Sequence, residues 1–349
     1  MGWSEDDLAR LRARYADDPG GRMHDPALAA VAEKLFDRGA RSAPFAGVSS
    51  FLDAPLRIAD PEAPDFAGLD VAISGAPIDL GVSNRPGARF GPRAVRTIER
   101  VGPYHHVFGC LPLHDLRVAD VGDAPFPSRY DLASAHAALE AWTRAMVEAG
   151  AAPLTVGGDH SISHPILRAV GRDRPVGMVL IDAHSDTGGP FDGQRFNHGA
   201  PFRNAVLDGV LDPTRTVQIG LRGSSAYLYE FARESGMTCI PAEEVAAMGV
   251  PAVIERARAV ATGPVYVSFD IDALDPAFAP GTGTPEIGGL TTREAQAILR
   301  GLKGLDVVGG DVVEVAPQYD PTTNTAHAAA QMLFEILSLM VYSPSVGGR

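Results

Sequence analysis

Cysteine is scarce in this chain of 349 residues, which contains only Cys110 and Cys239. Neither cysteine has a metal-binding spacing, and two cysteines offer no disulfide framework, so we expect a reducing, cytoplasmic location. Basic residues are also in the minority, with 30 Lys and Arg against 43 Asp and Glu. The net charge of −13 argues against a polyanion such as nucleic acid as a partner.

Long hydrophobic runs are lacking as well. No stretch of about 18 apolar residues occurs, so no membrane span is expected, and the acidic start Met-Gly-Trp-Ser-Glu-Asp-Asp does not predict a signal peptide. No phosphate-binding P-loop or Gly-x-Ser-x-Gly elbow occurs. The segment 281–286 begins like a dinucleotide fingerprint, but Glu286 stands where the third glycine belongs. We expect a soluble protein in which this segment is a surface turn near a site.

From about residue 70, short Val- and Ile-rich segments alternate with helical patterns. This alternation predicts an α/β fold with a parallel sheet covered on both faces. The predicted strands are Val71–Ser74, Arg117–Val121, Ala152–Val156, Gly177–Ile181, Thr216–Gly220, Met237–Ile240, Val265–Phe269 and Val307–Val312. The predicted helices between them are Leu132–Ala149, Ile166–Val170, Ala252–Ala261, Thr292–Leu302 and Ala326–Leu339.

Residues 1–65 have a different character from the rest. Amphipathic patterns predict short helices at Asp6–Tyr15 and Pro26–Asp37, followed by a connection that contains Pro and Ala. We interpret residues 1–65 as an extension that packs on the core or on a neighbouring subunit, and residues 66–349 as the catalytic domain.

Two of the predicted strands end in closely spaced metal-ligand residue types. Residues i and i+2 of an extended chain point to the same face. Asp182 and His184 can therefore aim at one point, and Asp186 can join them where the strand opens into a loop. Asp270 and Asp272 repeat this spacing at the end of another strand.

A third strand ends in Gly157-Gly158-Asp159-His160-Ser161. Taken alone, each segment is more commonly a helix cap or a turn. Ligands that follow three parallel strands meet at one edge of the sheet, however, where carboxylates repel one another unless cations neutralise them. Asp and His donors without a thiolate favour Mn²⁺, with Ni²⁺, Co²⁺ or Zn²⁺ as alternatives. The three segments together predict a centre with two divalent ions.

Two further residues are candidates for a role in the reaction. His198 lies in the loop that follows the Asp186 segment, where a role as an ordinary hydrogen-bonded residue is the alternative. Glu314 lies between valines at the end of another strand. A buried glutamate is costly unless a cation pairs with it, either an arginine of the protein or the substrate itself.

These segments resemble the ureohydrolase family of arginases, agmatinases and related guanidino-compound hydrolases, over about residues 66–340. The resemblance implies a three-layer α/β/α arginase-like fold with a central eight-stranded, mostly parallel sheet, and a homotrimer or homohexamer. It also implies that one ion is bound by His160, Asp182, Asp186 and Asp270, and a second by Asp182, His184, Asp270 and Asp272.

The resemblance further implies hydrolysis of a guanidino compound to urea and an amine. His198 matches the family's proton-shuttling histidine, and Glu314 matches the glutamate that holds the guanidinium group. We count Asp186, which is also an expected ligand, with these two as catalytic residues, whereas Asp159 is expected to orient its neighbours.

The substrate is expected to lie in the agmatinase and guanidino-acid branch. Gly188 and Gly189 stand where arginases carry polar side chains that bind the α-amino and α-carboxylate groups, which disfavours L-arginine. The sequence around His198 has the pattern of the agmatinase and guanidino-acid branch. The expected substrates are 4-guanidinobutyrate, 3-guanidinopropionate and agmatine.

The loop residues leave an alternative open. Arg85, Arg89 and Arg195 could pair with a substrate carboxylate, or they could form structural ion pairs. Phe191 and Phe196 could instead close the pocket around free guanidine, an alkylated guanidine or a biguanide, as in nickel-dependent relatives of this branch. We include Arg89, Arg195 and Phe191 among the expected substrate-binding residues.

Two other classes of protein fit less well. A deacetylase-like amide hydrolase uses one zinc and lacks the paired-Asp pattern. A non-catalytic subunit of a mixed oligomer would be expected to have lost some ligands, whereas all six are present here.

Overall fold

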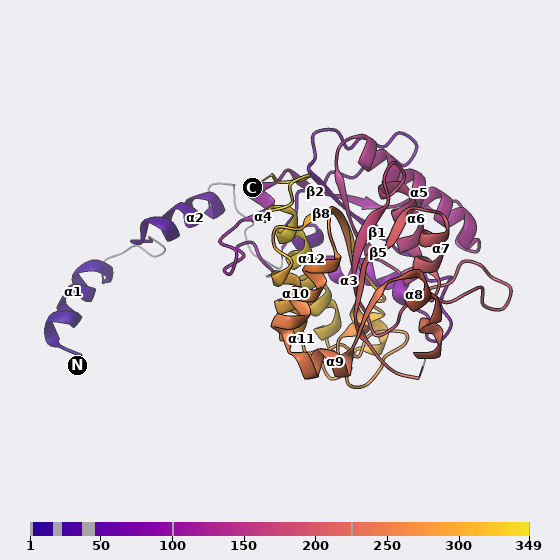
Figure 1. Cartoon of the computed structure of the whole chain (residues 1–349). Coiled ribbons are helices and arrows are strands. Elements are labelled where there is room, and N and C mark those ends of the chain that lie inside the picture. Colours follow the sequence, from indigo (N-terminus) through magenta and orange to yellow (C-terminus); the bar gives the residue numbers. More distant parts are fainter. Residues whose placement is uncertain (1–2, 17–22, 37–45, 100, 225, 349) are drawn as a thin grey trace. The chain divides into compact units, whose positions relative to one another are not determined.

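The computed structural model describes residues 3–16, 23–36, 46–99, 101–224 and 226–348 (Figure 1). The chain divides into two compact units, Met1–Gly47 and Val48–Arg349. The smaller unit contains helices α1 (Glu5–Tyr15) and α2 (Pro26–Phe36), at the places that the amphipathic patterns predict. Asp37, the last residue of the second expected helix, lies outside the described residues.

The larger unit begins earlier than the boundary expected between residues 65 and 66. Phe51 is fully buried in the core, and its backbone N–H donates to Asp120 Oδ2 at 3.0 Å. The backbone N–H of Arg57 donates to the Asp120 carbonyl at 2.9 Å, and Leu56 forms a parallel bridge with Asp120. Residues 50–59 therefore pack with the sheet, because Phe51 and Ala59 are buried and backbone groups of this segment bond to Asp120 and Val121.

The larger unit is built on one sheet of eight strands, and every pair of neighbouring strands is parallel. Their order is β2-β1-β3-β8-β7-β4-β5-β6. All eight predicted strands are confirmed. Their bounds are β1 Val71–Ala76, β2 Val118–Asp123, β3 Ala152–Gly157, β4 Val176–Ile181, β5 Leu211–Leu221, β6 Thr238–Pro241, β7 Pro264–Asp270 and β8 Asp306–Val313.

Helices cover both faces of this sheet, as expected for strands that are apolar along their whole length. Along β4, Val179 and Ile181 belong to one hydrophobic cluster and Met178 and Leu180 to the other, because alternate side chains point to opposite faces. One face is covered by α3 (Gly91–Arg96), α9 (Ala242–Met248), α10 (Val250–Val260), α11 (Thr292–Gly301) and α12 (Asn324–Met340). The other is covered by α5 (Leu132–Glu148), α6 (Ser163–Val170), α7 (Pro201–Leu207) and α8 (Glu230–Ser235).

Short helices account for most of what the sequence patterns missed. Helices α3, α7, α8 and α9 contain six or seven residues each, and α4 (Pro112–Asp115) contains four. Segments this short show too few turns for a helical period to stand out. No helix among the described residues is both long and apolar enough to cross a membrane.

The strand order decides where the site lies. The strands β3, β8, β7 and β4 are consecutive in the sheet and parallel, so their carboxyl ends share one edge. Gly157, Asp182, Asp270 and Glu314 lie at or directly after these four ends. The three predicted ligand segments and Glu314 are thereby brought to one crevice, the usual place for a site in a parallel sheet.

Candidate metal centre

Strand pairing places the two central carboxylates side by side. Ile181 of β4 pairs with Phe269 of β7, so Asp182 and Asp270 occupy the next position on neighbouring strands. Both side chains are buried, Asp182 completely. The Asp270 carboxylate also receives the backbone N–H of Asp272 at 2.8 Å, which fixes the turn that follows β7.

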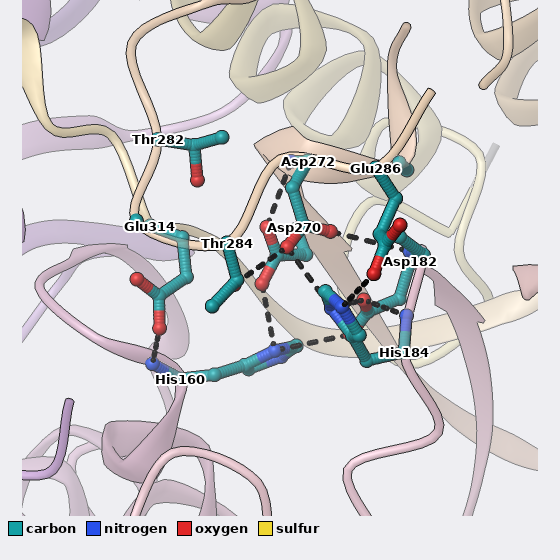
Figure 2. Close-up of polar contacts among 12 residues, drawn as sticks. His160, Asp182, His184, Asp270, Asp272, Thr282, Thr284, Glu286 and Glu314 are labelled. Carbon is teal, nitrogen blue, oxygen red and sulfur yellow. Dashed lines mark hydrogen bonds and ion pairs between the residues drawn. The ribbon is translucent and has the colours of Figure 1, made fainter. Parts of the chain in front are cut away.

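The first donor cluster surrounds one nitrogen of His160. His160 Nδ1 lies 3.2 Å from Asp182 Oδ2, 3.0 Å from Asp186 Oδ2 and 3.1 Å from Asp270 Oδ2. Figure 2 shows His160, Asp182 and Asp270 pointing toward one another from different segments. All four side chains of the cluster are at least nine-tenths buried.

The second donor cluster lies around His184. His184 Nδ1 is 3.1 Å from Asp272 Oδ2 and 3.7 Å from Asp182 Oδ1. Asp182 therefore presents one oxygen to each cluster. Thr284 Oγ1 donates to Asp272 Oδ2 at 3.2 Å and holds that carboxylate in place.

The donor atoms fit divalent cations. His160 Nδ1 and Asp182 Oδ2 are buried without a hydrogen-bond partner. Burial and the charges of Asp186 and Asp272 raise the pKa of Asp182 to about 7, and burial and the neighbouring carboxylates raise that of Asp270 well above its usual range. Such a concentration of buried acid is stable as anions only when cations neutralise it. Imidazole nitrogens and carboxylate oxygens suit Mn²⁺ and related ions.

The carboxylates of the two clusters also raise the pKa of the two histidines. Burial opposes protonation of His184, but the charge of Asp272 and a hydrogen bond to it raise the pKa of this imidazole to about 11. Burial likewise opposes protonation of His160, whereas the nearby carboxylates of Asp182, Asp186 and Asp270 raise its pKa well above the ordinary value. In the absence of metal, protons take the place of cations at both clusters.

Asp159 orients the chain beside the first cluster and does not point into it. Its Oδ1 accepts the Ser161 N–H at 2.9 Å, and its Oδ2 accepts the Gly81 N–H at 2.8 Å. Burial and the charge of Glu314 raise the pKa of Asp159 to about 6. This buried carboxylate therefore ties the His160 turn to the loop that follows β1.

Glu314 and His198 form a hydrogen-bonded pair next to the donor clusters. Glu314 Oε1 accepts from the His160 backbone N–H at 2.9 Å and lies 2.9 Å from His198 Nδ1. Its other oxygen, Oε2, is buried and has no partner. Glu314 and Asp186 both have positive φ, 64° and 49°, which is costly for residues with a side chain. Backbone strain at these two positions is consistent with a functional site.

His198 is held at both of its ring nitrogens. Opposite Glu314, its Nε2 lies 2.7 Å from Ser83 Oγ. Burial opposes protonation, but the charge of Glu314 and the hydrogen bond to it raise the pKa of His198 to about 9. The raised pKa favours the protonated imidazole in the metal-free protein, while the Ser83 backbone N–H also approaches Nε2 at 3.2 Å.

A cavity of about 220 Å³ opens above these groups. Ser83, Leu228 and Tyr229 line it and were not anticipated. Ser83 lies in the loop after β1, which also ends at the carboxyl edge of the sheet, so strand order could have indicated it. The complete lining is Ser83, His184, Ser185, Asp186, Gly188, His198, Gly199, Leu228, Tyr229, Asp270 and Thr284.

The arginines expected at the substrate do not line this cavity. Arg89 pairs with the buried carboxylate of Asp79. Arg195 donates to Asp208 at 3.0 Å and to Asn204 at 3.3 Å, on the helix that follows its loop. Both arginines therefore form structural ion pairs, the alternative that the sequence left open.

Arg85 and the two loop phenylalanines also lie outside the lining. Arg85 donates to the Thr282 carbonyl at 2.7 Å and stacks on Tyr319. Phe191, expected to bind substrate, is 60% exposed. Phe196 packs against the ring of His136, with centroids 5.0 Å apart. These residues lie in loops that contribute other residues to the cavity lining, but their own side chains do not line the cavity.

The fold and its donor clusters define an α/β protein built around a two-metal centre, and the comparisons identify the family. Residues 69–338 match the arginase family. A guanidinopropionase from Pseudomonas aeruginosa is 50% identical over 304 residues, which cover 86% of this chain and 93% of that protein. A mitochondrial guanidino acid hydrolase from Homo sapiens is 47% identical, over 83% of this chain and 82% of its own length.

A solved structure agrees with these relatives. The proclavaminate amidino hydrolase from Streptomyces clavuligerus superposes with a TM-score of 0.79 at 38% identity, covering 88% of this chain and 100% of that one. The chain therefore belongs to the arginase family and is a hydrolase of that family. The expected three-layer fold is confirmed with it.

Proposed function

We propose that this protein hydrolyses a short guanidino acid, such as 3-guanidinopropionate or 4-guanidinobutyrate, to urea and an amino acid. The names of a guanidinopropionase at 50% identity and a guanidino acid hydrolase at 47% support this substrate class, whereas an agmatinase that is also 47% identical supports agmatine. Agmatine, which carries an amine in place of the carboxylate, is the related substrate to compare with it.

The buried, unpartnered Oε2 of Glu314 carries the proposal. A carboxylate oxygen inside a protein needs a donor or a cation, and a planar guanidinium group supplies both in one charge-assisted hydrogen bond. The other oxygen is fixed by His160 and His198, so Glu314 cannot turn away. We infer that Glu314 binds the guanidinium group and orients its central carbon toward the donor clusters.

The donor clusters supply the rest of the site. We propose that one ion is held by His160, Asp182, Asp186 and Asp270, and the other by Asp182, His184, Asp270 and Asp272. Two divalent ions bound there would neutralise developing charge and activate a water molecule near neutral pH. The strained Asp186 backbone holds its carboxylate between the first cluster and the cavity, a position consistent with a catalytic role.

His198 provides the proton for the leaving group. It lines the cavity, and the charge of Glu314 raises its pKa, which favours the protonated form. Glu314 and Ser83 fix the direction of its ring from both sides. We infer that His198 acts as a general acid toward the nitrogen that departs with the amine.

We further propose Mn²⁺ as the resident ion, with Ni²⁺ as the alternative, because both accept these nitrogen and oxygen donors. A homotrimer or homohexamer in the cytoplasm, with no nucleic-acid or membrane partner, remains the expected setting. The arginase-family match and the net charge of −13 support the oligomer and the absence of a nucleic-acid partner, respectively.

One observation favours a second candidate, a hydrolase of free or alkylated guanidine. Within the part of the chain that the structure describes, no Lys or Arg side chain lines the cavity. A substrate without a carboxylate would need no such cation. Leu228, Tyr229 and the two glycines of the wall suit a short apolar tail.

The test is urea release from a panel of compounds by the full-length protein after loading with Mn²⁺ or Ni²⁺. The panel contains 3-guanidinopropionate, 4-guanidinobutyrate, agmatine, L-arginine, methylguanidine and guanidine. We expect the highest kcat/KM for one of the two guanidino acids. A preference for guanidine or methylguanidine would establish the second candidate, and no urea from any compound with either ion would refute the proposal and favour a non-catalytic subunit.

A further inference from the structure

A buried carboxylate outside the donor clusters has no obvious partner for its charge. Asp311 lies on β8 and is completely buried. Three hydroxyl groups donate to it: Ser163 Oγ at 2.5 Å and Tyr266 Oη at 2.8 Å to Oδ2, and Ser268 Oγ at 2.6 Å to Oδ1. The carboxylate is thus hydrogen-bonded on both oxygens.

Among the residues that the structure describes, no Lys, Arg or His side chain forms an ion pair with Asp311. A carboxylate that is buried without a cation is expensive, even when hydroxyl groups donate to it. The three hydroxyl groups around it are themselves buried, two on the neighbouring strand β7 and one on α6. A purely structural role would be served better by apolar side chains of the same size.

One of the three hydroxyls connects Asp311 to the first donor cluster. Ser268 Oγ lies 2.9 Å from His160 Nε2, on the side of the ring opposite to Nδ1. Ser268 and Asp311 are register partners on β7 and β8, so the backbone ladder fixes their separation. The chain of contacts Asp311–Ser268–His160 therefore reaches one nitrogen, Nε2, of the ring whose other nitrogen, Nδ1, faces the three carboxylates of the first cluster.

The hydrogen-bond roles along this chain follow from counting donors. A serine hydroxyl has one hydrogen, and Ser268 gives it to Asp311. Ser268 can then only accept from His160, which requires a hydrogen on Nε2. The Nδ1 of a neutral imidazole is then left with a free lone pair, the form that binds a metal.

We propose that Asp311 is a positioning residue that acts through Ser268 to fix the tautomer and the ring orientation of His160 for metal binding. This inference rests on the proposed metal centre and goes beyond the ligand set. Tyr266 and Ser163 complete the hydrogen bonding of Asp311 without contributing to the connection. Asp311 has no such contact with the His184 and Asp272 cluster, so its effect is confined to the first ion.

The experiment is a calorimetric titration of Mn²⁺ into the full-length protein after removal of metal by a chelator. Ser268→Ala removes the acceptor for His160 Nε2 and leaves every ligand in place. We expect the affinity of the His160 site to fall about 10- to 100-fold, the usual effect of losing a group that orients a ligand. The affinity of the His184 site should change less than about threefold, since its own supporting groups are untouched.

Tyr266→Phe is the matched control, because it removes another hydroxyl from the same carboxylate without breaking the connection to His160. Its metal affinity should stay within about threefold of wild type.

Asp311→Asn is the complementary variant. Its amide can donate to Ser268, which then donates to His160 and moves the ring hydrogen to the nitrogen that faces the ion. Ser268→Thr keeps the hydroxyl and should retain the affinity.

Thermal unfolding of each metal-free variant separates positioning from loss of structure. Equal weakening of both ion sites, or an equal effect of Tyr266→Phe and Ser268→Ala on affinity, would overturn the proposal. Unchanged affinity in Ser268→Ala with normal urea release by wild type would overturn it while leaving the proposed function intact. A wild-type protein that binds no Mn²⁺ and releases no urea would refute both.

Discussion

The two sides of the cavity are built in different ways. On the metal side, His160, Asp182 and Asp270 lie at or shortly after the carboxyl ends of β3, β4 and β7 and are buried. On the side that would face the substrate tail, Leu228 is part of a short turn and remains 45% exposed. The sheet thus fixes the chemistry of the site, whereas loops decide which tail fits, and substitutions on the two sides should have different consequences.

The largest effect is expected from Asp182→Ala. Asp182 presents an oxygen to each donor cluster, so its loss should remove metal binding. We expect kcat to fall by more than about 1,000-fold, a larger effect than the loss of a group that only orients a ligand. Metal content and urea release are measured together. Asp192→Asn, an exposed position in the following loop, is the control and should be neutral. Substantial activity in Asp182→Ala would show that the two clusters do not share this residue.

His198→Asn should separate proton transfer from metal binding. His198 lines the cavity, and its ring nitrogens bond to Ser83 and Glu314. Loss of a general acid lowers kcat by about 100- to 10,000-fold. Metal content, measured by atomic absorption, should remain at the wild-type level. Loss of metal from this variant would show that His198 also supports metal binding.

The pH profile of kcat/KM tests the charge of the same residue. The pKa of His198 is raised from 6.5 to about 9. The protonated imidazole, and the stabilisation that its pairing with Glu314 provides, are therefore fully present below pH 6.5. Both are lost as pH rises toward 9. We expect an alkaline decline in kcat/KM with an apparent pKa at or below about 9, since cations bound near Asp186 would lower the value. The decline should be absent from the residual activity of His198→Asn.

A change on the tail side should alter selectivity and leave the chemistry intact. Leu228→Ala shortens a side chain that lines the cavity and enlarges the cavity there. One methylene in an apolar pocket is worth about 10- to 200-fold in discrimination. We expect kcat/KM for 4-guanidinobutyrate to rise relative to 3-guanidinopropionate by about 10-fold, the low end of that range, because Leu228 is half exposed. An equal loss for both substrates would mean that Leu228 does not contact the tail.

The smallest effect is expected from Arg195→Ala. Arg195 is half exposed and pairs with Asp208 outside the cavity, and such pairs contribute about 0–1 kcal/mol. Its loss should change kcat/KM for every guanidino compound by less than about fivefold, the factor that corresponds to 1 kcal/mol. A large loss for the guanidino acids alone, with agmatine unaffected, would show that Arg195 turns toward the substrate carboxylate.

The contrast between the two sides also explains what the sequence could reveal. The strands and the Asp-x-His-x-Asp and Asp-x-Asp spacings are local patterns, and a parallel sheet brings the ends of adjacent strands together by itself. The orientation of Arg195 depends on Asp208, which lies 13 residues further along the chain on a different element. In a single sequence nothing distinguishes an arginine that finds such a partner from one that meets a substrate.

Asp311 illustrates the same limit inside the sheet. Three positions before Glu314, it lies in an apolar strand without a ligand spacing. Its importance comes from Ser268, which is 43 residues away and becomes its neighbour only through the pairing of β7 and β8. Tyr266 and Ser163 reach it through tertiary contacts as well. The residues of the donor clusters were therefore accessible to sequence reasoning, and their supporting contacts were not.

The most direct test of the account is a titration of metal-free protein with Mn²⁺ while urea release from 3-guanidinopropionate is followed. We predict no urea at the start and a rise in rate that reaches its maximum only when two ions are bound per chain. Full activity with one ion per chain, or with none, would contradict the assignment of two donor clusters that share Asp182.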